Sequence, residues 1–179
     1  HTLTNLVEDT GFPITSTLMG LGAYPASGNN WLGMVGMHGT YESNLAMHGC
    51  DVMINIGARF DDRVTGNLKF FSPYAKKIHV DIDSSSINKN VIVDVPILGD
   101  AGLALTEIFE QWKKRATRRK KKALKAWWKD IESWKSRDCL RYRQEDKFIK
   151  PQYAIQRLFE LTKDRNTFIT TEVGQHQMW

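Results

Sequence analysis

The first 111 residues predict an α/β fold in which a parallel sheet is flanked by helices. Two observations predict it. Short apolar runs rich in β-branched residues, such as 52–56 (VMINI), are typical of buried strands. These runs alternate with segments whose apolar residues recur at helical spacing. Strands that alternate with helices in this way favour a parallel sheet covered by helices.

Each element follows from a local pattern and a signal that begins or ends it. Gly11 can end a helix, Thr40 can cap one, and the loop over 19–30 is rich in Gly, Pro and Asn. In chain order, the expected elements are a helix over 1–9, strands over 12–18 and 31–35, a helix between Thr40 and Gly49, strands over 52–56 and 77–82, an extended segment over 91–95 that Pro96 ends, and a helix that follows Gly99 and Asp100. Three serines after Asp83 are typical of a helix cap.

The composition is that of a globular protein with an uneven charge distribution. The 179 residues include 25 Lys and Arg and 20 Asp and Glu, which gives a net charge of +5. Residues 112–150 alone carry 16 basic and 5 acidic residues. No apolar run approaches the roughly 18 residues of a membrane span, and no secretion signal opens the chain. Two distant cysteines, Cys50 and Cys139, argue against a disulfide framework or a structural zinc site.

The basic segment predicts an amphipathic helix with an aromatic stripe. Leu124, Trp127, Trp128, Ile131 and Trp134 recur at steps of three and four residues after a run of Lys and Arg. Basic residues with tryptophans can bind nucleic acid. The alternative is a solvated helix face whose tryptophans pack on the domain, and we favour it because such charge runs are usually solvated.

After this helix the sequence predicts a linker, a further helix and a strand. The linker covers 139–148, the helix begins at Pro151 and the strand covers 167–171. We therefore expect three parts: a domain over 1–111, a basic helical connection over 112–148, and the start of another domain over 149–179.

Residues suited to a ligand follow successive predicted strands. They lie in the segments 17–22 (TLMGLG), 36–40 (GMHGT), 57–63 (GARFDDR), 81–83 (DID) and 99–100 (GD). In a parallel sheet, ligands bind beyond the carboxyl ends of the strands, where glycines permit close backbone approach. Taken together, these segments predict a dinucleotide-like ligand.

Each segment alone has a plainer interpretation. The glycines of 17–22 are compatible with a simple turn, and His38 could make a structural hydrogen bond. Asp83 could cap a helix or contact a ribose. Arg59, Arg63 and the neighbouring aspartates form either an ion-pair network or an anion site. GxSxG, P-loop, HExxH and strict GxGxxG motifs are absent, and His176 or Glu172 could serve in acid–base chemistry without a visible partner.

Several longer motifs carry a family resemblance. The segments FPITSTLMGLGAYP, LGMVGMHGTYESNLAMH, GARFDDRVTG, KKIHVDIDSSSINKNV, VPILGD, KPQYAIQRLFELT and TTEVGQHQMW resemble the large catalytic subunits of acetohydroxyacid synthase, also called acetolactate synthase. The match covers residues 1–111 and 149–179. These motifs disfavour other thiamine enzymes, such as an oxidase or a glyoxylate carboligase. A free-standing nucleotide-binding module remains an alternative.

The resemblance implies a Rossmann-like central domain and specific cofactor contacts. The implied FAD contacts are Thr17, Leu18, Val35, Gly36, Met37, His38, Gly57, Ala58, Arg59, Phe60, Asp61, Asp81, Ile82, Asp100 and Ala101. Arg63 and Met37 would bind the second substrate, and Gln175 and His176 would contact thiamine diphosphate. Asn55 departs from a strand that is usually apolar in the family, so it needs a buried hydrogen-bond partner.

The resemblance also implies a transferase of branched-chain amino acid biosynthesis. Such an enzyme condenses pyruvate, after thiamine-dependent decarboxylation, with pyruvate or 2-oxobutyrate, and uses FAD, thiamine diphosphate and Mg²⁺. The family's activating glutamate and Mg²⁺-binding segment are not among these residues, so we expect no catalytic residue here and no activity from this segment alone. A homodimer or higher oligomer, a small regulatory subunit and a cytoplasmic or organellar location are further implications.

Overall fold

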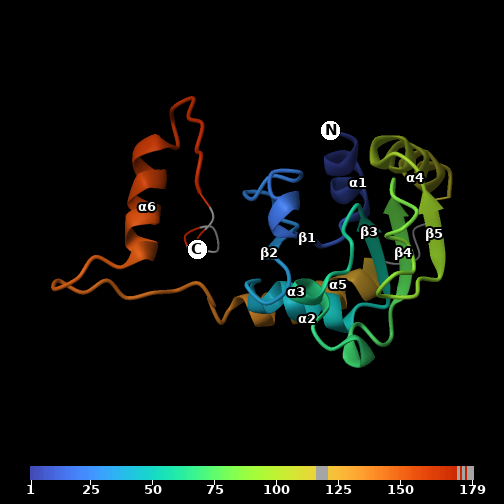
Figure 1. Cartoon of the computed structure of the whole chain (residues 1–179), viewed down its shortest axis with the longest axis horizontal. Helices are drawn as coiled ribbons and strands as arrows, with labels where there is room; N and C mark the ends of the chain where they lie inside the picture. Colours follow the sequence, from blue (N-terminus) through green and yellow to red (C-terminus); the bar gives the residue numbers. More distant parts are fainter. Residues whose placement is uncertain (116–120, 173, 175, 177–179) are drawn as a thin grey trace. The chain divides into compact units, whose positions relative to one another are not determined.

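Figure 1 shows the computed structural model of the chain, which describes residues 1–115, 121–172, 174 and 176. The chain divides into two compact units, His1–Cys139 and Leu140–Trp179. The first unit contains the strands and the helices that pack on them, whereas the described residues of the second include the helix α6 (Pro151–Thr162). No helix within the described residues is both long and apolar enough to cross a membrane.

The strands of the first unit pair in parallel, as the sequence predicts, but they form two separate sheets rather than the single sheet expected. β1 (Ile14–Ser16) pairs with β2 (Trp31–Met34), and β4 (Lys76–Asp81) lies between β3 (Val52–Ile56) and β5 (Val95–Leu98). The β3–β4 register runs from the Val52–Lys76 pair to the Ile56–Val80 pair. β4 is central in its sheet, and its last three residues are buried. Parallel sheets with flanking helices confirm the α/β class.

The helices of the first unit begin and end at the expected signals. Gly11 adopts φ 69° after α1 (Thr2–Thr10), and its N–H donates to the carbonyl of Val7. The Thr40 side chain accepts from the N–H of Ser43 at the start of α2 (Tyr41–Gly49). The remaining helical elements are η1 (Leu18–Gly20), α3 (Asp62–Thr65), η2 (Leu68–Phe70), α4 (Ala101–Arg115) and α5 (Lys121–Lys135).

Two apolar clusters form the core of the first unit. Phe60, Phe71 and Val93 form one cluster, against which Met47, Met53 and Val91 pack. The other cluster contains Leu32 from β2, Ala46 from α2 and Ile131 from α5. Helix α5 therefore contributes to the same compact unit as the sheet, and Ile131 is fully buried there.

The tryptophans of α5 face this second cluster. Trp127, Trp128 and Trp134 pack against it, and the Trp128 indole N–H donates to the carbonyl of Gly11 at 2.8 Å. The arrangement matches the interpretation that the sequence favours, which is a solvated helix face whose tryptophans pack on the domain.

Four local expectations differ from the structure. The first strand is shorter than 12–18, because Leu18 already begins η1. The segment expected over 91–95 pairs instead as Val95–Leu98, with Pro96 inside the strand. Proline is tolerated there because β5 lies at the edge of the sheet and needs no outward N–H donor. No helix follows Asp83, whose carboxylate accepts from Ser85 within a turn.

The fourth difference lies in the second unit, where residues 167–171 form no strand. A strand needs a neighbour to satisfy its backbone groups, and the described residues of that unit contain none. Residues 139–148, which we expected to be a linker, have neither helix nor strand. Helix α6 begins with Pro151 at its first position, as predicted.

Candidate functional site

The turns that follow the five strands are joined to one another by backbone hydrogen bonds. In each bond named here, the N–H of the first residue donates to the carbonyl oxygen of the second. The bonds are Val35 to Ser16 (3.0 Å), Met37 to Arg63 (2.8 Å), Gly57 to Val80 (2.8 Å) and Gly99 to Asp81 (2.9 Å). The first bond joins the ends of β1 and β2, the second joins the turn after β2 to α3, and the last two join the ends of β3, β4 and β5. The strand ends thus form one continuous row.

All fifteen residues expected to contact FAD lie in this row of turns. They lie at or just beyond the ends of β1 (Thr17, Leu18), β2 (Val35, Gly36, Met37, His38), β3 (Gly57, Ala58, Arg59, Phe60, Asp61), β4 (Asp81, Ile82) and β5 (Asp100, Ala101). Within each of the two sheets, parallel strands end on one side, and the Met37–Arg63 hydrogen bond joins the two edges.

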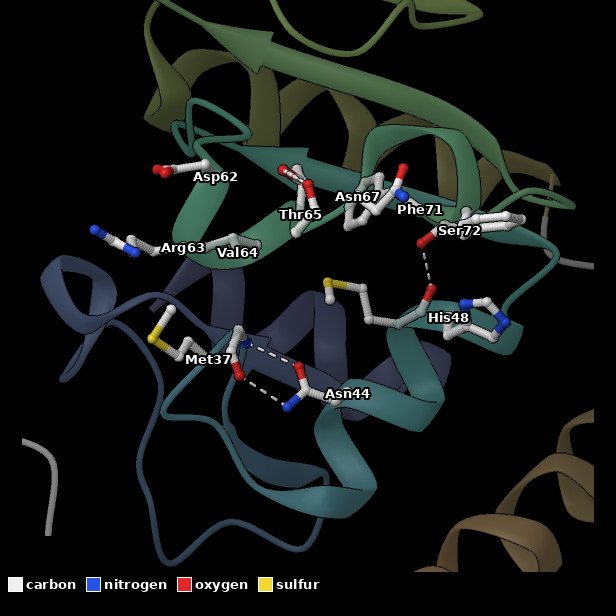
Figure 2. A pocket seen from close by; sticks show the side chains of 14 residues that line it. Met37, Asn44, His48, Asp62, Arg63, Val64, Thr65, Asn67, Phe71 and Ser72 are labelled. Atoms are coloured by element: carbon white, nitrogen blue, oxygen red, sulfur yellow. Dashed lines mark hydrogen bonds between the residues drawn. The ribbon is translucent and has the colours of Figure 1, made fainter.

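The turn after β2 is fixed by Asn44 of α2. The N–H of Gly36 donates to the Asn44 side chain at 2.8 Å, and the Asn44 amide donates to the Gly36 carbonyl at 2.9 Å (Figure 2). Gly36 has φ 94°, and a Cβ atom there would overlap the carbonyl oxygen of Arg63. Glycine is therefore required for this turn to approach the backbone of α3.

Met37 and Arg63, which were predicted together as substrate residues, are neighbours in the structure. Their backbones share the 2.8 Å hydrogen bond, and Figure 2 shows both side chains extending to the same side. Met37 is 63% exposed, and the exposed Arg63 has no ion pair among the described residues. A guanidinium in this state can bind a carboxylate through two parallel hydrogen bonds.

A pocket of about 370 Å³ opens beside this pair, between α2 and α3. Met37, Met47, Val64 and Phe71 contribute apolar surface to it (Figure 2). Its polar lining includes Asp62 and Arg63 from the predicted segment 57–63. It also includes residues that we did not identify as a site from the sequence, which are Asn44, His48, Thr65, Asn67 and Ser72. Only the helical spacing of Asn44, Met47 and His48 could have indicated that these α2 residues share a face.

The turn after β3 keeps its polar groups at the surface and turns its aromatic ring inward. Asn55 finds the partner it needs, since its amide exchanges two hydrogen bonds with the backbone of Ala58 (2.5 and 3.2 Å). Arg59 lies 3.9 Å from Asp61, and its side chain is 74% exposed. Phe60 has φ 53° and is only 5% exposed, so any ligand contact by Phe60 would involve its backbone.

Aspartates shape the turns that follow β4 and β5. Asp81 is 7% exposed and accepts from the N–H of Asp83 at 2.8 Å, whereas Ile82 between them is 74% exposed. The Ser85 hydroxyl and backbone N–H, and more weakly Ser86, hold the pKa of Asp83 below its usual value. Asp100 accepts from the N–H of Leu103 at 3.0 Å and caps α4.

The residues expected to meet thiamine diphosphate lie in the second unit. His176 is exposed, and its Nε2 lies 2.9 Å from the carbonyl oxygen of Glu172. Gln175 lies outside the described residues. In the described parts of both units, no group of three or more His, Cys, Asp or Glu side chains could hold a metal ion.

Comparison with known proteins identifies the class to which this fold and row of turns belong. Residues 1–108 match the family model described as thiamine pyrophosphate enzyme, central domain. The match covers more than half of the chain, and the chain belongs to this family of thiamine pyrophosphate enzymes.

Its similarity is specific within that family. The chain is 45% identical over 177 residues to the acetolactate synthase isozyme 3 large subunit of Escherichia coli (strain K12), which covers 99% of this chain and 31% of that protein. It is 49% identical over 172 residues to the acetolactate synthase large subunit of Buchnera aphidicola subsp. Schizaphis graminum, covering 96% of this chain and 29% of that protein. It is 44% identical over 177 residues to acetolactate synthase 3, chloroplastic, of Brassica napus. This alignment covers 99% of this chain and 27% of that protein. The chain thus spans about a third of the length of the curated relatives it matches.

Proposed function

We propose that this chain is part of the catalytic subunit of an acetolactate synthase. The observation that supports this most strongly is 44–49% identity to the acetolactate synthase large subunits of two bacteria and to an acetolactate synthase of a plant, over 96–99% of the chain. The proposed reaction condenses pyruvate, after its thiamine-dependent decarboxylation, with pyruvate or 2-oxobutyrate. Its products are precursors of branched-chain amino acids.

We propose that the row of strand-end turns binds FAD. An extended dinucleotide needs close backbone approach, cationic groups for its diphosphate and apolar surface for its rings. The row offers Gly57, where a Cβ would meet nothing within 4 Å, the exposed Arg59, and the exposed side chain of Ile82. Because the net reaction is not redox, FAD would have a structural role.

Arg63 and Met37 are proposed to receive the second 2-ketoacid. The Arg63 guanidinium is exposed and would pair with the carboxylate of that substrate. Met37 lies beside it through the backbone hydrogen bond and would provide apolar surface for the remainder of the substrate. This chain would therefore bind and orient a substrate.

The remaining cofactors are assigned to the carboxyl-terminal part of the chain and to residues outside it. Thiamine diphosphate, which would supply the carbanion chemistry, is proposed to contact Gln175 and His176, with Mg²⁺ held elsewhere in the protein. We propose the domain organisation expected above: residues 1–111 as a central FAD domain, 112–148 as a helical connection and 149–179 as the start of the thiamine diphosphate domain.

The assembly and location are also proposals. A homodimer or higher oligomer of the catalytic subunit, with a small regulatory subunit, fits an enzyme whose active site lies between subunits. The cytoplasm is the proposed location for a bacterial protein of this kind. An organelle is the alternative, as the chloroplastic name of the Brassica relative illustrates.

Product formation by the full-length protein tests the proposed function. The protein, supplied with thiamine diphosphate, Mg²⁺ and FAD, is expected to convert pyruvate to acetolactate and CO₂, and to form the mixed product when 2-oxobutyrate is added. Release of CO₂ with acetaldehyde or acetate, and no condensation product, would place the protein with another thiamine enzyme.

A further inference from the structure

His79 is a buried polar side chain without a hydrogen-bond partner among the described residues. It lies in β4 and is 0% exposed, and neither ring nitrogen meets hydrogen-bond geometry. Its nearest charged neighbour is Asp81, whose Oδ2 lies 3.5 Å from His79 Nε2. A buried polar group without a partner destabilises a fold, so stability alone does not explain a histidine here.

The groups around His79 leave Asp81 as its available partner. In the register, its neighbours are Asn55 of β3, whose amide is committed to Ala58, and Pro96 of β5, which has no N–H. The ring of Phe60 packs edge-on at a centroid distance of 5.1 Å. His79 therefore touches two turns of the row, through Phe60 after β3 and through Asp81 at the end of β4.

Asp81 in turn controls the backbone at the end of β4. Its side chain accepts from the N–H of Asp83, and its carbonyl accepts from the N–H of Gly99. These two bonds fix the turn that exposes Ile82 and attach it to the end of β5. The second carboxylate oxygen, Oδ2, is the one that faces His79.

We infer that His79 is a positioning residue for nucleotide binding. In the bound protein, its Nε2–H donates to Oδ2 of Asp81, closing the 3.5 Å separation, and its ring supports Phe60. The bond requires a proton on Nε2. His79 thereby holds the turn at the end of β4, where an acidic residue of a dinucleotide site meets a ribose. This inference rests on the proposed binding of FAD.

Substitutions that separate the two ring nitrogens test the inference in the full-length protein. The amide nitrogen of Gln stands near the position of Nε2, whereas that of Asn stands near Nδ1. We expect His79→Gln to keep FAD affinity within about threefold of the original protein. His79→Asn, a matched polar control, and His79→Leu are expected to weaken FAD binding at least tenfold, a factor that measured dissociation constants resolve.

Two fragments of FAD show where the loss arises. The ribose belongs to the ADP half, so ADP binding is expected to weaken in His79→Asn and His79→Leu, while FMN binding is unchanged. Melting temperatures of the flavin-free variants separate this effect from general destabilisation. Equal FAD affinity in the Gln and Asn variants, unchanged affinity in His79→Leu, or losses that merely follow the melting temperature would each overturn the inference. Absence of FAD binding to the original protein would instead refute the proposed flavin site, and the inference with it.

Discussion

Gly36 shows how one residue fixes the geometry beside Arg63. Its φ of 94° is unfavourable for any side chain, and a Cβ would overlap the Arg63 carbonyl oxygen. We predict that Gly36→Ala lowers the free energy of unfolding by about 2–4 kcal/mol, from backbone strain and steric overlap. Urea denaturation of the full-length protein measures this change in the free energy of unfolding.

The matched control is Gly99→Ala. A Cβ at Gly99 would meet nothing within 4 Å, and its φ is not in the left-handed region. Its free energy of unfolding should change by less than about 0.5 kcal/mol. Equal losses in the two variants would show that the close approach of Gly36 to Arg63 is not what requires glycine.

Arg63 and Arg59 should have separable roles although they are four positions apart. Arg63→Ala is expected to raise the half-saturating concentration of the second 2-ketoacid at least tenfold, because a charge-assisted contact with its carboxylate is lost. FAD occupancy should remain nearly constant. Steady-state kinetics and flavin absorbance of the purified variant provide the two measurements.

Arg59→Ala provides the opposite comparison. Its exposed side chain belongs to the proposed FAD row, so its substitution should lower FAD affinity more than it affects ketoacid saturation. If Arg63→Ala loses FAD and ketoacid binding equally, Arg63 has been assigned to the wrong ligand.

Single residues also show where prediction from sequence stops. The need of Asn55 for a buried partner was predictable, because a polar amide in an apolar strand must be satisfied, and Ala58 supplies the bonds. The inward ring of Phe60 and the contact between His79 and Asp81 were not predicted. They depend on a left-handed backbone conformation and on side chains brought together from different strands.

At the scale of elements, α5 stabilises the first unit through its apolar stripe. Ile131 is fully buried between β2 and α2, among three tryptophans. We predict that Ile131→Ala destabilises this unit by about 2–5 kcal/mol, because it removes buried methyl groups and leaves a cavity. Urea unfolding followed by tryptophan fluorescence reports directly on this cluster.

Leu103→Ala in α4 is the control for this prediction. Leu103 is 75% exposed, so its loss should change the unfolding midpoint little. An Ile131→Ala variant as stable as Leu103→Ala would show that α5 does not pack on the sheet unit in solution.

Elements were predictable where local signals were strong. The VMINI strand has the predicted bounds, and Thr40 and Gly11 delimit helices as expected. The strand near Pro96 was misplaced because tolerance of proline depends on an edge position, which is a property of the whole sheet. The segment 167–171 has strand-forming residues but no neighbour to pair with in its unit.

At the scale of the molecule, the row of turns unites residues that are far apart in the sequence. The hydrogen bond between Met37 and Arg63 joins the edges of the two sheets, whereas within each sheet parallel pairing brings the strand ends to one edge. This is why the sequence could predict that the turns share an edge. The pocket between α2 and α3 could not be predicted in the same way, because it depends on how these two helices approach each other.

Flavin content of the purified full-length protein tests the central claim, which is that these turns together hold one flavin nucleotide. Absorbance after incubation with FAD and removal of the free cofactor should show about one bound FAD per polypeptide. Protein that remains free of flavin after the same treatment would contradict the account.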